Sequence, residues 1–245
     1  MEKRAEALLE DNEASQLFGI IVAIFAVVLT IVAFIVWQRK KSVGRSVLIT
    51  GLCDAGKTLL YARLIHSRFI ETYTSAKENV DDIEIKDNSL KIVDIPGHER
   101  LRYRIFDKYK SSARGLIFVI DSVTFQKDIR DVAEFLYTLL CDSSLQKSLP
   151  ILVLCNKQDQ ALAKGCKVIR NLLEKELNLV RVTKSSQLEA TDASSTNTFL
   201  GKEGKDFEFD DVSMKIEFAE CSAFSKESET SAEIEQLQDW LEKIL

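Results

Sequence analysis

The stretch Gly51–Thr58 reads GLCDAGKT and lies between two segments with different hydrophobic patterns. The apolar run SVLIT before it is typical of a buried strand, and LLYARLI after it has apolar residues at helical spacing. The pattern G-x-x-x-x-G-K-S/T between a strand and a helix is typical of a phosphate-binding loop. We therefore predict that this stretch binds the phosphates of a nucleoside triphosphate.

Each residue type in this loop has a separate task. Gly51 allows a sharp turn, and Gly56 lets the backbone approach an anion closely, so that successive N–H groups point at the phosphates. Lys57 is expected to reach the β- and γ-phosphates, and the Thr58 hydroxyl is expected to hold Mg²⁺. The predicted nucleotide-binding residues of the loop are Gly51, Leu52, Cys53, Asp54, Ala55, Gly56, Lys57, Thr58 and Leu59.

The overall composition excludes one class of partner. The 245 residues include 33 basic and 38 acidic ones, so no basic excess marks a nucleic-acid surface. We therefore expect no direct contact with nucleic acid. The length suits one or two domains with a substantial core.

An uncharged apolar segment covers residues 17–37. As a helix it is long enough to cross a hydrocarbon core of about 30 Å, so we predict one transmembrane helix. Residues 1–16 carry five acidic and two basic residues, which argues against the alternative of a cleaved signal peptide. The basic residues within 38–45 predict a juxtamembrane linker on the cytosolic side, and hence a short N-terminus across the membrane.

After the linker, strand-like and helix-like segments alternate. This order predicts an α/β fold with a mostly parallel six-stranded sheet and helices on both faces, over residues 46–245. A polar segment before the second apolar strand suits an antiparallel edge hairpin. One stretch, at about 181–211, is rich in Ser and Thr and has no periodicity, so we expect a long exposed loop there.

Three further motifs follow the predicted ends of strands, where ligands bind in open α/β sheets: DIPGHE, NKQD and CSAF. In the first, Asp94 can accept hydrogen bonds from the water shell of Mg²⁺. The backbone N–H of Gly97 can donate to a γ-phosphate that is present only before hydrolysis. The order of these motifs after a phosphate-binding loop makes each of them more specific than it is alone.

The NKQD motif, residues 156–159, predicts the choice of base. The Asp159 carboxylate can accept two hydrogen bonds from guanine, whereas adenine presents an acceptor there and leaves the carboxylate unpaired. Lys157 can lay its stem along the base and Asn156 can brace the loop, while Ala223, next to Ser222, can donate its backbone N–H to the guanine oxygen. The predicted cofactors are therefore GTP and Mg²⁺.

These four motifs in this order resemble those of the small GTPases over about residues 46–245, and GLCDAGKT and CSA resemble the Arf and Sar branch. The stretches DIPGHERLR, SSARGLIFVIDS, CNKQD and LGKEGKDFEF, together with one N-terminal span, resemble the family of signal recognition particle receptor beta subunits. The resemblance implies an endoplasmic reticulum membrane location, a lumenal N-terminus, and an alpha-subunit partner bound through the GTP form. It also implies the translocon or the ribosome as neighbours.

The sequence departs from the small-GTPase pattern at two places. His98 occupies the position where Ras- and Arf-like proteins carry a water-orienting Gln, so it is the predicted catalytic residue or else a solvated switch residue. No Pro-Thr signature precedes the edge hairpin. Thr74 is the predicted second metal-coordinating hydroxyl, with Ser75 and Thr72 as rivals and an ordinary capping role as the alternative.

The motifs leave two functions open. The first is a membrane-anchored GTP switch with slow intrinsic hydrolysis, whose GTP state orders the loops around Thr74 and His98 into a partner-binding surface. The second is a constitutive membrane tether in which the nucleotide only stabilises the fold. An Arf-like regulator that cycles on and off membranes conflicts with the full span and with Glu2, where myristoylation requires Gly.

Overall fold

The computed structural model describes residues 23–31, 34, 44–86, 88–145, 149–189, 200–202, 204–224 and 232–245. The chain divides into two units, Met1–Val43 and Gly44–Leu245. The second begins close to the predicted domain start at residue 46.

In the first unit, residues 23–31 form a helix. No helix within the described part of the chain is long and apolar enough to cross a membrane. Residues 17–22, 32–33 and 35–37 of the predicted span lie outside the described residues, as do residues 1–16 and 38–43. The predicted span therefore stays a prediction.

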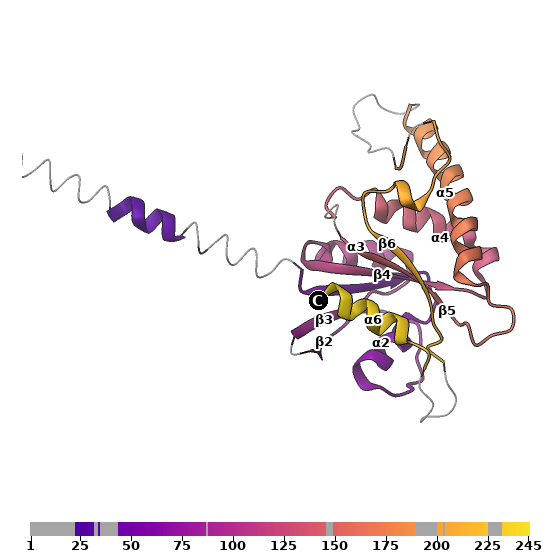
Figure 1. The fold of residues 1–245 in the computed structure, drawn as a ribbon, viewed down its shortest axis with the longest axis horizontal. Coiled ribbons are helices and arrows are strands. Elements are labelled where there is room, and N and C mark those ends of the chain that lie inside the picture. Colours follow the sequence, from indigo (N-terminus) through magenta and orange to yellow (C-terminus); the bar gives the residue numbers. More distant parts are fainter. Residues whose placement is uncertain are drawn as a thin grey trace, which may run out of the picture. The chain divides into compact units, whose positions relative to one another are not determined.

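The second unit is built on one six-stranded sheet with the order β2-β3-β1-β4-β5-β6 (Figure 1). The strands are β1 Ser46–Gly51, β2 Asn79–Ile85, β3 Asn88–Asp94, β4 Ala113–Asp121, β5 Ile151–Asn156 and β6 Ile216–Glu220. Only β2 is antiparallel to its neighbour, and all other pairs are parallel. The predicted mostly parallel sheet and its antiparallel edge hairpin are both confirmed.

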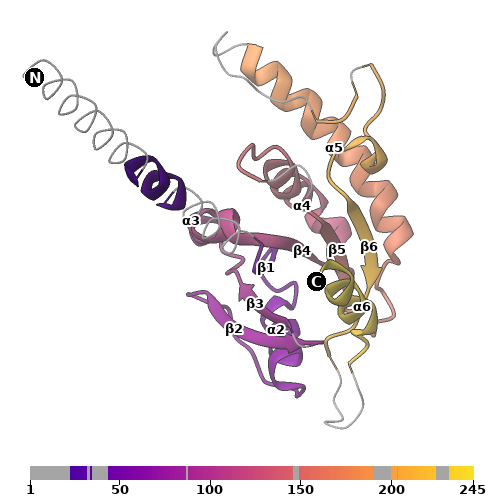
Figure 2. The same ribbon diagram turned by 60° about the vertical axis from the view of Figure 1, so that its left-hand side comes forward.

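Helices cover both faces of the sheet, as predicted (Figure 2). The helices are α2 Lys57–His66, α3 Glu99–Tyr109, α4 Phe125–Leu140, α5 Cys166–Glu189 and α6 Glu235–Ile244, with short 3₁₀ helices η1 Lys110–Ser112 and η2 Phe209–Asp211. One core cluster joins α3, α4 and α5 to one face. The other joins α2 and α6 to the opposite face.

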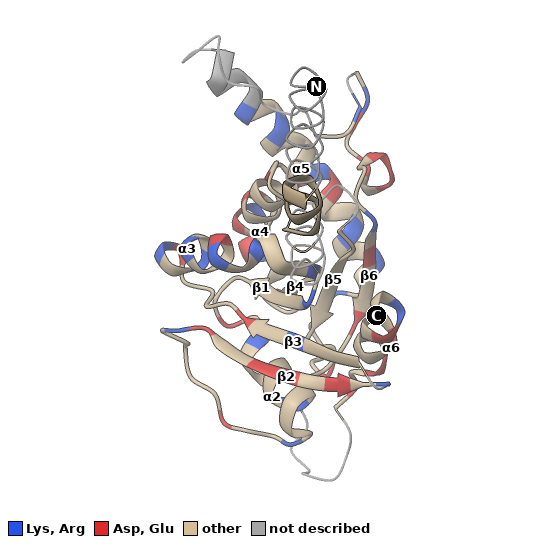
Figure 3. Ribbon diagram, turned by 90° about the vertical axis from the view of Figure 1, so that its left-hand side faces the viewer, with Lys and Arg blue, Asp and Glu red and all other residues tan. Residues whose placement is uncertain are grey.

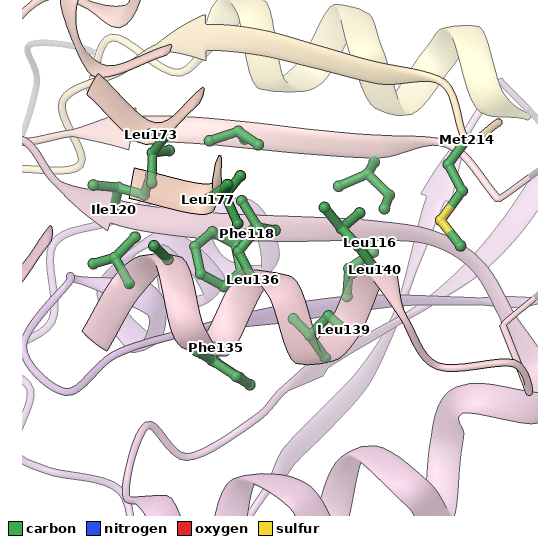
Figure 4. Close-up of a cluster of buried hydrophobic side chains, with 14 of the residues drawn as sticks. Leu116, Phe118, Ile120, Phe135, Leu136, Leu139, Leu140, Leu173, Leu177 and Met214 are labelled. Atoms are coloured by element: carbon green, nitrogen blue, oxygen red, sulfur yellow. The ribbon is translucent and has the colours of Figure 1, made fainter. Parts of the chain in front are cut away.

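The larger core lies between α4, α5 and the central strands (Figure 4). Leu116, Phe118 and Ile120 alternate along β4 and meet Leu136 of α4, because alternate residues of a strand point to the same face. Leu173 and Leu177 of α5 complete this layer, which holds the carboxyl ends of the strands in place.

The prediction of a long exposed loop at about 181–211 is wrong at both of its ends, while residues 190–199 and 203 lie outside the described residues. Residues 181–189 continue helix α5, and the chain then returns through a segment in which Leu200, Phe207 and Phe209 are buried. The buried Arg181 donates hydrogen bonds to the carbonyls of Leu200 (3.2 Å), Lys202 (3.3 Å) and Lys205 (2.6 Å). A buried guanidinium needs several acceptors, and this segment provides them from its backbone.

Helix α3 is not predicted from the sequence. Its arginines differ in role: Arg100 and Arg104 are exposed, whereas the guanidinium of Arg102 lies 4.1 Å from the centre of the Phe135 ring of α4. Figure 3 shows both basic and acidic residues on α3, and acidic residues on β2. Tertiary packing of Ile105 and Phe106 therefore supports a helix whose sequence is dominated by charge.

Candidate nucleotide-binding site

The phosphate-binding loop connects β1 to α2 through two glycines in unusual backbone conformations. Gly51 has φ +145° and Gly56 has φ +88°, a region that other residues rarely adopt. A Cβ atom at Gly51 would overlap the carbonyl oxygen of Val119, and one at Gly56 would overlap the side-chain amide of Asn156. Both positions therefore require glycine for space as well as for conformation.

Lys57 begins α2 and bends back over the loop. Its ammonium donates a hydrogen bond of 2.5 Å to the carbonyl of Leu52, and the side chain is buried. Burial lowers the pKa of Lys57, while the nearby Asp94 carboxylate acts in the opposite direction. None of the ion pairs within the described residues involves Lys57, so its charge is available to an anion in the loop.

Polar oxygen atoms gather beside the first turn of α2. The Thr58 hydroxyl donates to Asp94 Oδ2 at 2.8 Å and lies 3.0 Å from the Ser75 hydroxyl. Asn79 of β2 donates to the same Asp94 oxygen at 3.0 Å. Asp94 is fully buried, its Oδ1 has no hydrogen-bond partner within the described structure, and burial raises the pKa of its carboxyl group. An unpaired buried carboxylate oxygen next to two hydroxyls matches the oxygen ligands that Mg²⁺ prefers.

The three candidate hydroxyls for the metal differ in position. Thr72, Thr74 and Ser75 all line the cavity in front of the loop. Only Ser75 is within hydrogen-bond distance of Thr58, and no hydrogen bond in the described structure joins Thr74 to Thr58 or Asp94. The geometry therefore favours Ser75 among the three rivals, and the ligand role of Thr74 stays a prediction.

Asn156 connects the base-reading loops to the phosphate-binding loop. Its side-chain nitrogen donates to the carbonyl of Ala55 at 2.8 Å, and its oxygen accepts the backbone N–H of Ala223 at 3.1 Å. The Cys221 thiol lies 3.4 Å from the same oxygen. The bracing role predicted for Asn156 is thus present in the structure, and it also occupies the Ala223 N–H that the sequence analysis assigns to guanine.

Two more contacts organise the base-reading loops. Lys157 has φ +68° and forms an ion pair of 2.7 Å with Asp121 at the end of β4. Burial acts to raise the pKa of Asp121, but the hydrogen bonds from Lys157 and the Val123 backbone bring it below its usual value. The exposed Asp159 accepts a hydrogen bond of 2.7 Å from the Ser222 hydroxyl through Oδ1. No hydrogen bond within the described part of the chain involves the second carboxylate oxygen of Asp159, so a base can use it.

These elements surround a cavity of about 440 Å³ at the carboxyl ends of the strands. Its lining contains these predicted residues: Cys53, Asp54, Gly56, Lys57, Thr58, Leu59, Thr74, Ser75, Gly97, Asn156, Lys157 and Ala223. The other predicted residues of the site do not line the cavity; they are Gly51, Leu52, Ala55, Asp94, Asp159 and Ser222. The four motifs therefore meet at one place.

His98 lies at the start of helix α3. It is the N-cap of α3, where its Nδ1 accepts the backbone N–H of Arg100 at 3.3 Å. The side chain is exposed and does not line the cavity. The catalytic role of His98 therefore stays a prediction.

Three residues outside the predicted set support the site. Asn79 holds Asp94, Asp121 holds Lys157, and the buried Arg63 donates to the carbonyl of Ala223 at 3.2 Å. Asp121 could have been found, because it ends the apolar run GLIFVID at the same sheet edge as the other motifs. Asn79 and Arg63 have no comparable signal, because their partners are distant in sequence.

Comparison with known proteins supports this geometry. The family model for the signal recognition particle receptor beta subunit matches residues 42–216. The signal recognition particle receptor subunit beta of Mus musculus is 48% identical over 235 residues, covering 93% of this chain and 87% of that protein. The chain belongs to the signal recognition particle receptor beta-subunit family.

Solved structures extend this result to the fold. The structure of the mammalian SRP receptor aligns with a TM-score of 0.72 and 46% identity, covering 82% of this chain and all of that one. Two structures of Chaetomium thermophilum SRb, one with GDP and Mg and one with GTP in complex with SRX, align with TM-scores of 0.64 and 0.61. They are 23% and 20% identical, cover 83% and 81% of this chain and 99% and 97% of those chains, and support the fold alone.

Membership of the beta-subunit family confirms the resemblance seen in the motifs and the small-GTPase fold that it implied. It also gives the chain a role in the receptor for the signal recognition particle.

Proposed function

We propose that this beta-subunit family member binds GTP with Mg²⁺ in the cavity and acts as a membrane-anchored switch. In its GTP state it holds the receptor alpha subunit at the endoplasmic reticulum. The observation that carries the proposal is the link from Asn156 to both Ala55 and Ala223, because it joins the phosphate-binding and base-reading loops into one site.

The phosphate side of the cavity suits a triphosphate with a metal ion. Lys57 supplies a buried cationic charge, and the loop N–H groups add a favourable field at the start of α2. Thr58 and Ser75 would hold Mg²⁺ directly, with Asp94 behind them. The metal would neutralise phosphate charge, and this chain's residues would keep it in place.

The base side suits guanine. Asp159 is already oriented by the Ser222 hydroxyl, and Lys157 is held by Asp121, so both side chains are positioned before a base arrives. Preorganised groups lose less entropy on binding. The relative from Chaetomium thermophilum has been solved with GDP and with GTP, which supports the same choice for this chain.

The switch itself rests on Gly97 and the 72–75 segment. A Cβ atom at Gly97 would lie 2.6 Å from the backbone nitrogen of Cys53, so the segment before α3 touches the phosphate-binding loop. A γ-phosphate there would change both segments, and a partner that contacts them would sense the nucleotide.

One observation favours the tether as a second candidate. The ring of His98 caps α3, and His98 is not among the residues that line the cavity, so the one predicted catalytic side chain is engaged elsewhere in this structure. Slow hydrolysis would leave GTP bound permanently, and the nucleotide would then stabilise the fold without cycling.

The two functions differ in one measurable quantity. The full chain, loaded with either GTP or GDP, is titrated with the receptor alpha subunit. A switch predicts at least about tenfold tighter binding with GTP, equal to a coupling of about 1.4 kcal/mol. Equal affinities would reject the switch and leave the tether.

A further inference from the structure

Arg63 carries a charge inside the protein, in the helix that follows the phosphate-binding loop. It lies in α2, six residues after Lys57, and only 5% of its surface is exposed. A buried guanidinium is costly unless hydrogen bonds compensate it. Its Nε donates to the carbonyl of Ala223 at 3.2 Å, so α2 contacts the last base-reading loop directly.

The same guanidinium touches an aromatic pair at the rim of the cavity. Its central carbon lies 5.7 Å from the centre of the Phe69 ring. The Phe69 ring in turn meets the Phe224 ring edge to face, with 5.7 Å between centres. Because Phe224 lines the nucleotide cavity, Arg63 supports one wall of it both through the Ala223 backbone and through two rings.

These contacts link α2, the last base-reading loop and the phosphate-binding loop to one another. Arg63 holds the carbonyl of Ala223, the N–H of Ala223 donates to Asn156, and Asn156 donates to Ala55 in the phosphate-binding loop. Ala55 is followed, two residues later, by the start of α2, which carries Arg63. Loss of Arg63 would therefore free the outer base-reading loop while the contact between Asn156 and Ala55 remained.

Resting on the proposed function, we propose that Arg63 is a positioning residue for guanine binding. By holding Ala223 and the Phe69–Phe224 pair, it fixes the base side of the cavity before the nucleotide arrives. The phosphate side depends on Lys57, Thr58 and the loop N–H groups, none of which contacts Arg63 in the hydrogen bonds described. Arg63 should therefore affect the binding of the base and leave the binding of the phosphates unchanged.

The test compares two ligands on the full chain in the presence of Mg²⁺: GTP and inorganic tripolyphosphate. Arg63→Met keeps most of the apolar stem and removes the guanidinium. We expect this variant to bind GTP on the order of tenfold more weakly, as for loss of a hydrogen bond to a charged group. Its affinity for tripolyphosphate should stay within about twofold of the wild-type value. The control Arg68→Met removes an exposed arginine of the same segment and should change neither affinity.

A purely structural role for Arg63 predicts something else. In that case Arg63→Met would lower the affinity for both ligands equally and would lower the midpoint of thermal unfolding. Either this result or an unchanged affinity for GTP would overturn the proposal. If Arg63→Met does not fold, Phe224→Leu decides, because Phe224 is 41% exposed and its loss should give the same selective weakening of GTP. Failure of the wild-type chain to bind GTP would overturn the proposed function itself, and this inference with it.

Discussion

Asn156 donates a hydrogen bond of 2.8 Å to the carbonyl of Ala55, across 101 positions of sequence. Both residues are buried, so the bond is shielded from water. Through the opposite end of its amide, Asn156 also accepts from Ala223. A single side chain therefore satisfies backbone groups in two loops that must keep a fixed separation to bind one nucleotide.

Asn156→Ala should destabilise the nucleotide-free domain. It leaves the Ala55 carbonyl and the Ala223 N–H buried without partners, at a cost of about 2–4 kcal/mol for the two groups. Urea denaturation measures the loss, and Asn171→Ala on the exposed surface of α5 is the matched control. A change below about 0.5 kcal/mol, equal to that of the control, would mean that Asn156 does not brace the loops.

Ser75→Ala should weaken Mg²⁺ binding more than Thr74→Ala does. The Ser75 hydroxyl is 3.0 Å from that of Thr58, where a metal ion would replace the hydrogen bond between them. The measurement is the Mg²⁺ concentration that half-maximally slows GTP release, for both variants and the wild type. A larger effect of Thr74→Ala would return the ligand role to Thr74 and show that the 72–75 segment moves when the nucleotide binds.

Arg181→Met should destabilise the domain without changing the nucleotide affinity. The guanidinium joins α5 to the returning segment through three backbone carbonyls and is itself held by Asn178 of α5, and neither residue lines the cavity. We expect a loss of about 3 kcal/mol in urea denaturation, because the carbonyls lose charge-assisted bonds. The exposed Arg104→Met is the control. Unchanged stability would show that the segment 200–211 holds to α5 through its apolar residues alone.

The motifs at the site could be predicted from sequence because parallel strands all end at one edge of the sheet. Gly51, Asp94 and Asn156 each end an apolar run, so their convergence follows from the topology. Helix α3 could not be predicted, since its charged sequence is helical only through packing of residues such as Phe106. The same holds for residues 181–189, where a polar sequence continues helix α5 and Arg181 joins that helix to the backbone at Lys205. Local pattern carries no information about such distant partners.

His98→Ala should slow GTP hydrolysis further from an already low rate, on the order of 10⁻⁴ s⁻¹ for unaided small GTPases. The structure adds a complication, because His98 also caps α3 and its loss should cost about 1 kcal/mol of stability. His98→Ser separates the two effects, since serine is a good N-cap but too short to reach the nucleotide. Single-turnover hydrolysis at the wild-type rate in both variants would remove His98 from catalysis.

Asp159→Asn tests most directly whether a guanine nucleotide in this cavity controls the binding of the partner. An amide at this position can donate to the carbonyl of xanthine where the carboxylate accepts from the amine of guanine, so the variant should prefer xanthosine nucleotides. Capture of the receptor alpha subunit by the variant is measured with XTP, XDP, GTP or no nucleotide. We predict capture with XTP and loss of capture with GTP, the reverse of the wild type. Capture that ignores the nucleotide, or that still follows GTP in the variant, would contradict the claim.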